Sequence, residues 1–192
     1  MQFEEIIAAV RKRAEQREAR TDCAENRPVQ LGVPAANEAI AFNEAQLGFT
    51  LHALHKALFI QVGNGGFGPG YGLVGLSGGI PDADGRDLLA LRDILWLDAE
   101  NPMPRYVVPL CDWGDAIWSC IQSQTGQVLV LDESGLKDTG DIFPDWIWRW
   151  AKGESLWERT VTFKEHTGID PFTRQPRTSV LVAGTKGTPY QP

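Results

Sequence analysis

The sequence predicts an α+β fold, in which several helices pack around one antiparallel β-sheet. Apolar residues at helical spacing dominate the chain up to residue 62, and short alternating segments separated by turns dominate residues 105–132. A glycine-rich stretch lies between these regions, at residues 63–76. With 192 residues, of which 43% are hydrophobic and 22% charged, the chain has the size and composition of a single globular domain.

Charge and cysteine content narrow the classes of function. The net charge of −7 argues against nucleic acid as a direct partner, because phosphate contacts require clustered lysine and arginine. The chain has no run of 18 apolar residues and begins with acidic residues, so neither a membrane span nor a signal peptide is expected. The cysteines at positions 23, 111 and 120 form no CxxC pair, which is typical of reduced thiols in the cytoplasm.

Three helices are predicted before the glycine-rich stretch. The first covers residues 2–19 and the second residues 34–47, each with apolar residues on one face. The third covers residues 51–62, with Thr50 as its N-cap and Gly63 just beyond its end.

The glycine-rich stretch contains the spacing G-x-G-x-x-G at residues 63–68, which matches a dinucleotide-binding motif. That motif binds pyrophosphate only between a strand and a helix N-terminus, whereas a helix is predicted before this one and no Walker lysine follows. We therefore expect an architectural role and no cofactor, with nucleotide binding as the minor alternative. The residues concerned are Gly63, Asn64, Gly65, Gly66, Phe67, Gly68, Pro69, Gly70, Tyr71 and Gly72.

The middle of the chain is predicted to supply the sheet. Residues 71–76 are expected to form the first strand and residues 85–95 a short helix. Pro109 implies an edge strand or a bulge, because proline cannot donate to a strand ladder. The expected meander has strands at residues 105–111, 116–122 and 127–132, with turns at residues 112–115 and 123–126.

The last part of the chain is predicted to hold a loop, a helix and an extension. Residues 133–141 are polar and acidic, which favours a loop. The next helix carries an aromatic stripe that we expect to be core, formed by Phe143, Trp146, Ile147 and Trp150. A domain at residues 1–159 is followed by an extension at residues 160–192, where the composition becomes polar, basic and rich in Pro, Thr and Gly. Composition alone favours a loosely held extension, and the alternative is that it packs against the domain or a neighbouring molecule.

Two pairs of side chains suggest chemistry, and both are better explained by structure. His52 and His55 are three residues apart on a predicted helix, but no HExxH motif or cysteine pair accompanies them, so no metal site is expected. Asp112 and Asp115 resemble a carboxylate pair, but aspartate is common in turns, where its side chain accepts hydrogen bonds from its own backbone. We therefore expect no catalytic residues and no enzyme activity.

Three blocks of the chain, in this order, resemble the SUKH superfamily, which includes a fungal cell-wall assembly regulator and many bacterial immunity proteins. Together they cover roughly residues 35–153, and the glycine-rich block is the most specific. The blocks are Leu47-Gly48-Phe49 running into residues 63–76, residues 108–114 continuing into 117–120, and Phe143 with Trp146, Ile147, Trp150 and Gly153.

The resemblance implies an α+β fold and, for bacterial members, immunity: the protein would bind and neutralise a cognate toxin of a polymorphic toxin system, frequently a nuclease. The toxin class does not transfer, because members differ in their partners and fold alone does not fix function. The alternative that the fungal members suggest is a constitutive regulatory or scaffold module without a toxin partner.

The charge distribution fits a basic partner such as a nuclease, whose cleft binds phosphate. Residues 81–145 hold thirteen acids and four bases, a net charge of −9. An acidic surface attracts a basic partner and speeds association, and a tryptophan among carboxylates would serve as an anchor. The predicted contact residues are Asp82, Asp84, Asp87, Asp112, Trp113, Asp115, Asp132, Glu133, Asp138 and Asp141.

Overall fold

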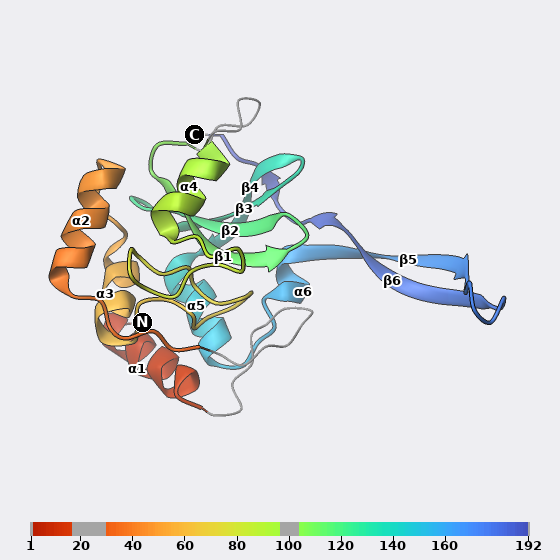
Figure 1. Cartoon of the computed structure of the whole chain (residues 1–192), viewed down its shortest axis with the longest axis horizontal. Coiled ribbons are helices and arrows are strands. Elements are labelled where there is room, and N and C mark those ends of the chain that lie inside the picture. The colour runs from red at the N-terminus through yellow and green to blue at the C-terminus, as the bar shows by residue number, and fades with distance from the viewer. Residues whose placement is uncertain (1, 17–29, 97–103, 192) are drawn as a thin grey trace.

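The computed structural model describes residues 2–16, 30–96 and 104–191. It has the predicted α+β fold, with an antiparallel five-stranded sheet and a separate two-stranded sheet (Figure 1). The helices are α1 (Phe3–Ala14), α2 (Asn37–Leu47), α3 (Ala53–Gln61), α4 (Leu88–Trp96), α5 (Phe143–Ala151) and α6 (Trp157–Thr160). The strands are β1 (Val107–Gly114), β2 (Ile117–Gln122), β3 (Gln127–Asp132), β4 (Gly135–Ile142), β5 (Val161–Ile169), β6 (Pro176–Thr185) and β7 (Thr188–Pro189).

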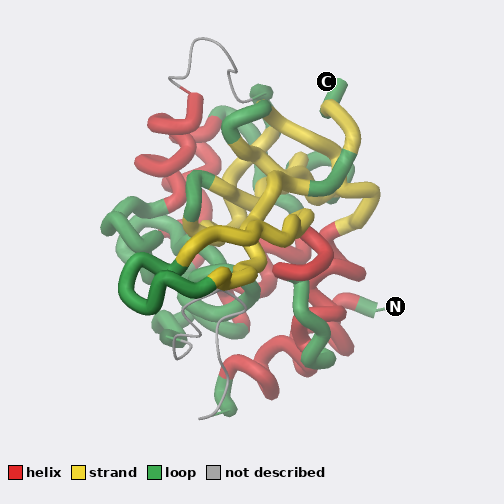
Figure 2. The backbone as a smooth tube through the Cα atoms, turned by 90° about the vertical axis from the view of Figure 1, so that its right-hand side faces the viewer, coloured by secondary structure: helices red, strands yellow, loops and turns green. Residues whose placement is uncertain are grey.

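The main sheet has the strand order β1-β2-β3-β4-β7, with antiparallel neighbours throughout. The predicted three-stranded meander is confirmed, and β3 has the bounds expected from the sequence. The turn predicted at residues 112–115 is shorter, because β1 continues to Gly114. β1 lies at the end of this strand order, and its register with β2 shifts after Pro109, as expected for a residue without a backbone N–H. Figure 2 shows the strands gathered together, with helices on more than one side of them.

Helix α5 carries the aromatic stripe into the core, as its spacing predicts. Phe143, Trp146, Ile147 and Trp150 are all buried, and Pro144 stands at the start of the helix, where its missing N–H leaves no partner unsatisfied. Helix α1 packs against α5. The buried side of α1 is formed by Ile6, Ile7, Val10 and Ala14.

Two predicted elements are wrong. Residues 71–76 do not form a strand; only Leu73 makes an isolated bridge, to Cys111, because the surrounding backbone is used in turns and close crossings. Residues 133–141 are not a loop, because most of them belong to β4. β4 pairs with β3 on one side and β7 on the other, so these backbone pairings hold a strand whose side chains are mostly polar and half-buried.

Helix boundaries shift by a few residues from those predicted. α2 begins at Asn37 and ends before Gly48, which is left-handed as expected. α3 begins at Ala53, so His52 rather than Thr50 occupies the N-cap position. The end of the first predicted helix, residues 17–19, falls outside the described residues.

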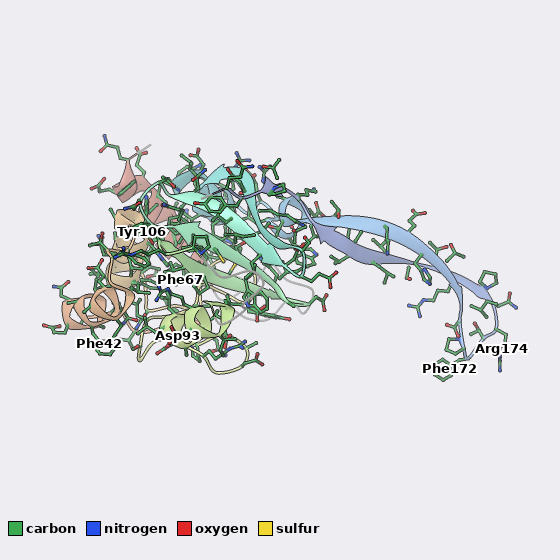
Figure 3. The ribbon with its side chains drawn as sticks, turned by 90° about the horizontal axis from the view of Figure 1, so that it is seen from above. Phe42, Phe67, Asp93, Tyr106, Phe172 and Arg174 are labelled. Carbon is green, nitrogen blue, oxygen red and sulfur yellow. The ribbon has the colours of Figure 1, made fainter. Side chains whose placement is uncertain are left out.

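The C-terminal extension is not loosely held. β5 and β6 pair along their length and form a hairpin that projects from the body of the protein (Figures 1 and 3). We call this hairpin, residues 161–185, the arm. The chain then returns to the main sheet, where β7 pairs with β4. None of the described helices is long and apolar enough to cross a membrane.

Candidate interaction surface

The glycine-rich segment is a close backbone crossing. A Cβ on Gly65 would lie 2.6 Å from the backbone nitrogen of Gly75, and one on Gly72 would lie 2.7 Å from the backbone of Gly66. Asn64 ties the crossing together, because its Oδ1 accepts a 2.8 Å hydrogen bond from the buried backbone N–H of Leu76. Backbone therefore occupies the space that these glycines leave open, which is the architectural use expected from the sequence.

Three of the ten predicted contact residues are buried. Asp82 accepts hydrogen bonds from the backbone N–H groups of Asp84 and Arg86 and pairs with the Arg86 guanidinium at 2.7 Å. The Asp112 carboxylate accepts a hydrogen bond from the Gly114 N–H, while burial raises its pKa. The indole of Trp113 is 2% exposed, so it serves the core rather than an accessible anchor.

Four more of these carboxylates are half-buried and hold the protein's own turns and strands together. Asp87 accepts hydrogen bonds from the Ser77 hydroxyl and from the backbone N–H of Ala90, near the start of α4. Asp138 accepts hydrogen bonds from Gln127 Nε2 and from the Gly140 N–H. Asp141 pairs with Arg159 at 3.3 Å, and Asp132 pairs with Lys137 at 2.9 Å.

The remaining three predicted acids, Asp84, Asp115 and Glu133, are exposed, and Asp84 also pairs with the Arg86 guanidinium at 2.5 Å. Asp115 lies in the β1–β2 turn, where it and Ala116 have φ of 51° and 56°, typical of a tight hairpin turn of type I′. Glu133 lies in the β3–β4 turn. These two turns occupy the same end of the sheet, because the four strands run antiparallel in sequence order. Asp84 acts electrostatically on Asp112, in the strand that leads to Asp115. We call these three exposed residues the acidic end.

The arm is rooted beside this acidic end. Asp132, next to Glu133, accepts a 2.7 Å hydrogen bond from the Thr185 hydroxyl at the end of β6. On the other side of the root, Trp157 lies between Trp113 of β1 and Phe163 of β5, with ring centroids 5.6 and 6.4 Å away. The acidic end and the arm root therefore form one continuous region.

Asp132 is the main polar anchor of the arm root. Burial raises its pKa, but hydrogen bonds from Ser134, Thr185 and Lys137 outweigh burial and bring the pKa well below its usual value. The carboxylate is therefore ionised at neutral pH and stabilises the folded root. Asp132 was predicted to contact a partner, because its bond to Thr185 joins positions far apart in the chain and leaves no local sequence signal.

Replacing Asp132 with Asn should weaken the arm root. We expect a loss of about 1–3 kcal/mol in the free energy of unfolding at pH 7, since the charge-assisted bonds disappear. An acid with a depressed folded pKa stabilises above its unfolded pKa, so the gap from wild type should narrow below about pH 4. Urea unfolding across this pH range measures the effect, and Glu133→Gln at the exposed neighbouring position should show little change. A gap that is constant with pH would contradict the assignment.

The two faces of the arm differ in chemistry. Residues paired across an antiparallel ladder point to the same face, and the hydrogen bond between the hydroxyls of Thr167 and Thr178 (3.2 Å) confirms this alternation. One face, which we call the apolar face, carries the exposed Phe163, Ile169 and Val180. The opposite face carries Lys164, His166 and Arg177 with Leu181.

The tip of the arm is also exposed. Phe172 is 94% exposed, and it and Arg174 lie at the far end of the arm from the body (Figure 3). This surface was not predicted, although the apolar run Val180-Leu181-Val182 is rich in β-branched residues and favours a strand.

The described histidines and cysteines inside the fold are held in unreactive forms. His55 is fully buried against Phe59 and Phe143, and burial, followed by the influence of His52, lowers its pKa to about 3. Burial raises the pKa of the Cys111 and Cys120 thiols, which keeps them protonated. Within the described residues, no group of three or more His, Cys, Asp or Glu side chains is arranged to hold a metal ion.

Comparison of the chain with protein-family models, with curated proteins and with solved structures gives no match.

Proposed function

We propose that this protein is a non-catalytic, cytosolic binding protein that neutralises a cognate toxin. This is the role that its SUKH-like blocks imply. The observation that carries the proposal is the acidic end, where Asp84, Asp115 and Glu133 stand exposed on turns fixed by the sheet. A rigid acidic projection suits a basic, phosphate-binding cleft, because complementary charge speeds association and a fixed turn loses little entropy on binding.

The internal chemistry supports a binding role. The buried histidine is neutral and the buried cysteines are protonated, so these groups favour packing over nucleophilic or acid–base work. The glycine-rich segment is filled by its own backbone. The buried acids bind neighbouring backbone and arginine groups.

The first experiment is capture of the tagged protein from its native lysate, with mass spectrometry of what co-purifies. A stoichiometric, basic, toxin-like protein whose toxicity this chain suppresses on co-expression would support the proposal. If no such partner is captured, even when neighbouring toxin-like genes are expressed, the regulatory-module alternative replaces it.

A charge variant of the acidic end tests the surface itself. In the triple variant Asp84→Lys, Asp115→Asn and Glu133→Lys, asparagine at position 115 keeps a residue that tolerates positive φ. We expect the association rate with the captured toxin to fall at least about tenfold at low salt, and its salt dependence to flatten. Stopped-flow binding at several salt concentrations measures both.

The matched control is Glu15→Lys, Asp93→Asn and Glu154→Lys, which makes the same change in net charge at exposed positions on other parts of the chain. It should bind at nearly the wild-type rate. Equal slowing in both triple variants would show that net charge, and not the acidic end, governs binding.

A further inference from the structure

We propose that the apolar face of the arm is covered by the same face of a second copy of this chain, so that the two arms stack antiparallel in a symmetric dimer. This proposal goes beyond the toxin-binding function and does not require it.

The exposed apolar side chains of the arm indicate that one of its faces is an interface. A lone two-stranded hairpin is marginal in water, because each strand has only one neighbour and neither face is packed. Here the paired strands project away from the body, and Ile169 and Val180 are 72% and 64% exposed on the apolar face. This face carries Phe163 and Val180 toward the root and Ile169 toward the tip, with Glu165 and Thr167 among them. Exposed apolar side chains gathered on one face of a ribbon indicate an interface rather than scattered surface residues.

A second copy fits this face because its residues are complementary to themselves when the ribbon is reversed. In an antiparallel stack about a two-fold axis near residue 166, Phe163 of one arm lies against Ile169 of the other. Glu165 of one arm then lies against Thr167 of the other, and their cross-strand neighbours place Val182 against Pro176 and Val180 against Thr178. Such an interface is closed, since the same patch is used on both copies.

The ends of the arm are complementary in the same arrangement. Nine residues of β5 span about 30 Å, so the tip of each arm reaches the root of the other. Phe172 would meet the aromatic root at Trp157, and Arg174 would approach the acidic end, where Asp115 and Glu133 are exposed. The opposite face, with Lys164 and Arg177, points outward to solvent in both copies, so their positive charges do not face one another across the interface.

Analytical ultracentrifugation of the full chain tests the dimer directly. We expect wild type to sediment at twice the 21.2 kDa of one chain at micromolar concentrations, and the variant Ile169→Lys with Val180→Lys to sediment as a monomer. The control variant, Ser179→Lys with Leu181→Lys, adds the same charge to the opposite face and should remain dimeric. A wild-type chain that stays monomeric throughout, or a control that dissociates equally, would overturn the proposal.

Crosslinking tests the orientation of the arms. Glu165→Cys and Thr167→Cys chains, each made in a Cys23→Ser background, are mixed and mildly oxidised. Because the proposed stack places position 165 against position 167 of the other copy, the mixture should give more than tenfold more covalent dimer than either variant alone. Equal yields in the three samples would reject the antiparallel stack.

The two proposals fail separately. Sedimentation and crosslinking use the isolated chain, so a negative result leaves toxin neutralisation standing. If wild type is monomeric and the Ile169→Lys, Val180→Lys variant loses toxin binding, the toxin covers the arm in place of a second copy. If the dimer forms but the triple variant of the acidic end binds toxin normally, the toxin surface is wrong and the dimer stands.

Discussion

Gly65→Ala should destabilise the protein by about 2–5 kcal/mol, a large fraction of the 5–15 kcal/mol that stabilises an ordinary domain. Two costs combine. Gly65 has φ of 86°, a left-handed conformation that an L side chain adopts at a cost of roughly 1–2 kcal/mol. The added methyl would also lie 2.6 Å from Gly75 N and 2.9 Å from Ile80 O, and these are backbone atoms that cannot rotate away.

Gly78→Ala separates the two costs. Gly78 belongs to the same region and has φ of 82°, but a Cβ there would meet no atom within 4 Å. We therefore expect a loss of only about 1–2 kcal/mol, from backbone conformation alone. The free energy of unfolding in urea, measured for both variants, gives the difference. Equal losses would mean that the crossing is not closely packed, and the architectural role of the segment would have to be abandoned.

The parts of the fold that could be predicted are those whose cause is local. The stripe of α5 follows from spacing within nine residues, and the shift in β1 follows from the missing N–H of Pro109. The boundaries of β3 could also be predicted, because turn residues flank it directly in the sequence. The glycine-rich segment is a partial case, because glycine density predicted special backbone positions but not which atoms would meet there.

The parts that could not be predicted depend on distant partners. β4 is polar and reads as a loop, but it becomes a strand because β3 and β7 pair with it, and β7 lies some fifty residues further along the chain. Residues 71–76 have the composition of a strand, but the folded chain uses their backbone in a crossing with residues 64–66 and 80. Local propensity loses to tertiary pairing in both cases.

The candidate site shows the same division. Charge composition located the acids in residues 81–145, but only three of the nine predicted carboxylates are exposed. The others are used inside the fold. No local pattern distinguishes the buried Asp82 from the exposed Asp84 two residues later, and Arg86 pairs with both of them. Burial of an acid depends on its partner's position, which a count of charges does not contain.

Trp150→Ala should remove roughly 3–5 kcal/mol from the free energy of unfolding, because it opens a large cavity where α1 meets α5. The Trp150 side chain is fully buried, and the Arg13 guanidinium lies over its ring at 4.6 Å and donates to its carbonyl oxygen. The substitution deletes the ring that holds this cation, so we expect α1 to loosen first. Hydrogen exchange at the amides of α1 should accelerate beyond the change in global stability.

Two further variants give the cause of that loss. Trp150→Phe keeps most of the ring volume and removes an indole N–H that is buried without a hydrogen-bond partner in the described structure. Its loss in free energy of unfolding should therefore be less than half of the loss for Trp150→Ala. Trp148→Ala, two residues away, removes a half-buried ring that Lys152 covers at 4.2 Å, and should cost only about 1–2 kcal/mol. If Trp148→Ala were as costly as Trp150→Ala, the buried volume of Trp150 could not be the cause, and helix propensity would not explain the losses either, because alanine has the higher propensity at both positions. The graded series expected here instead assigns them to the filled volume between α1 and α5, the contact that sets the N-terminal helix on the domain.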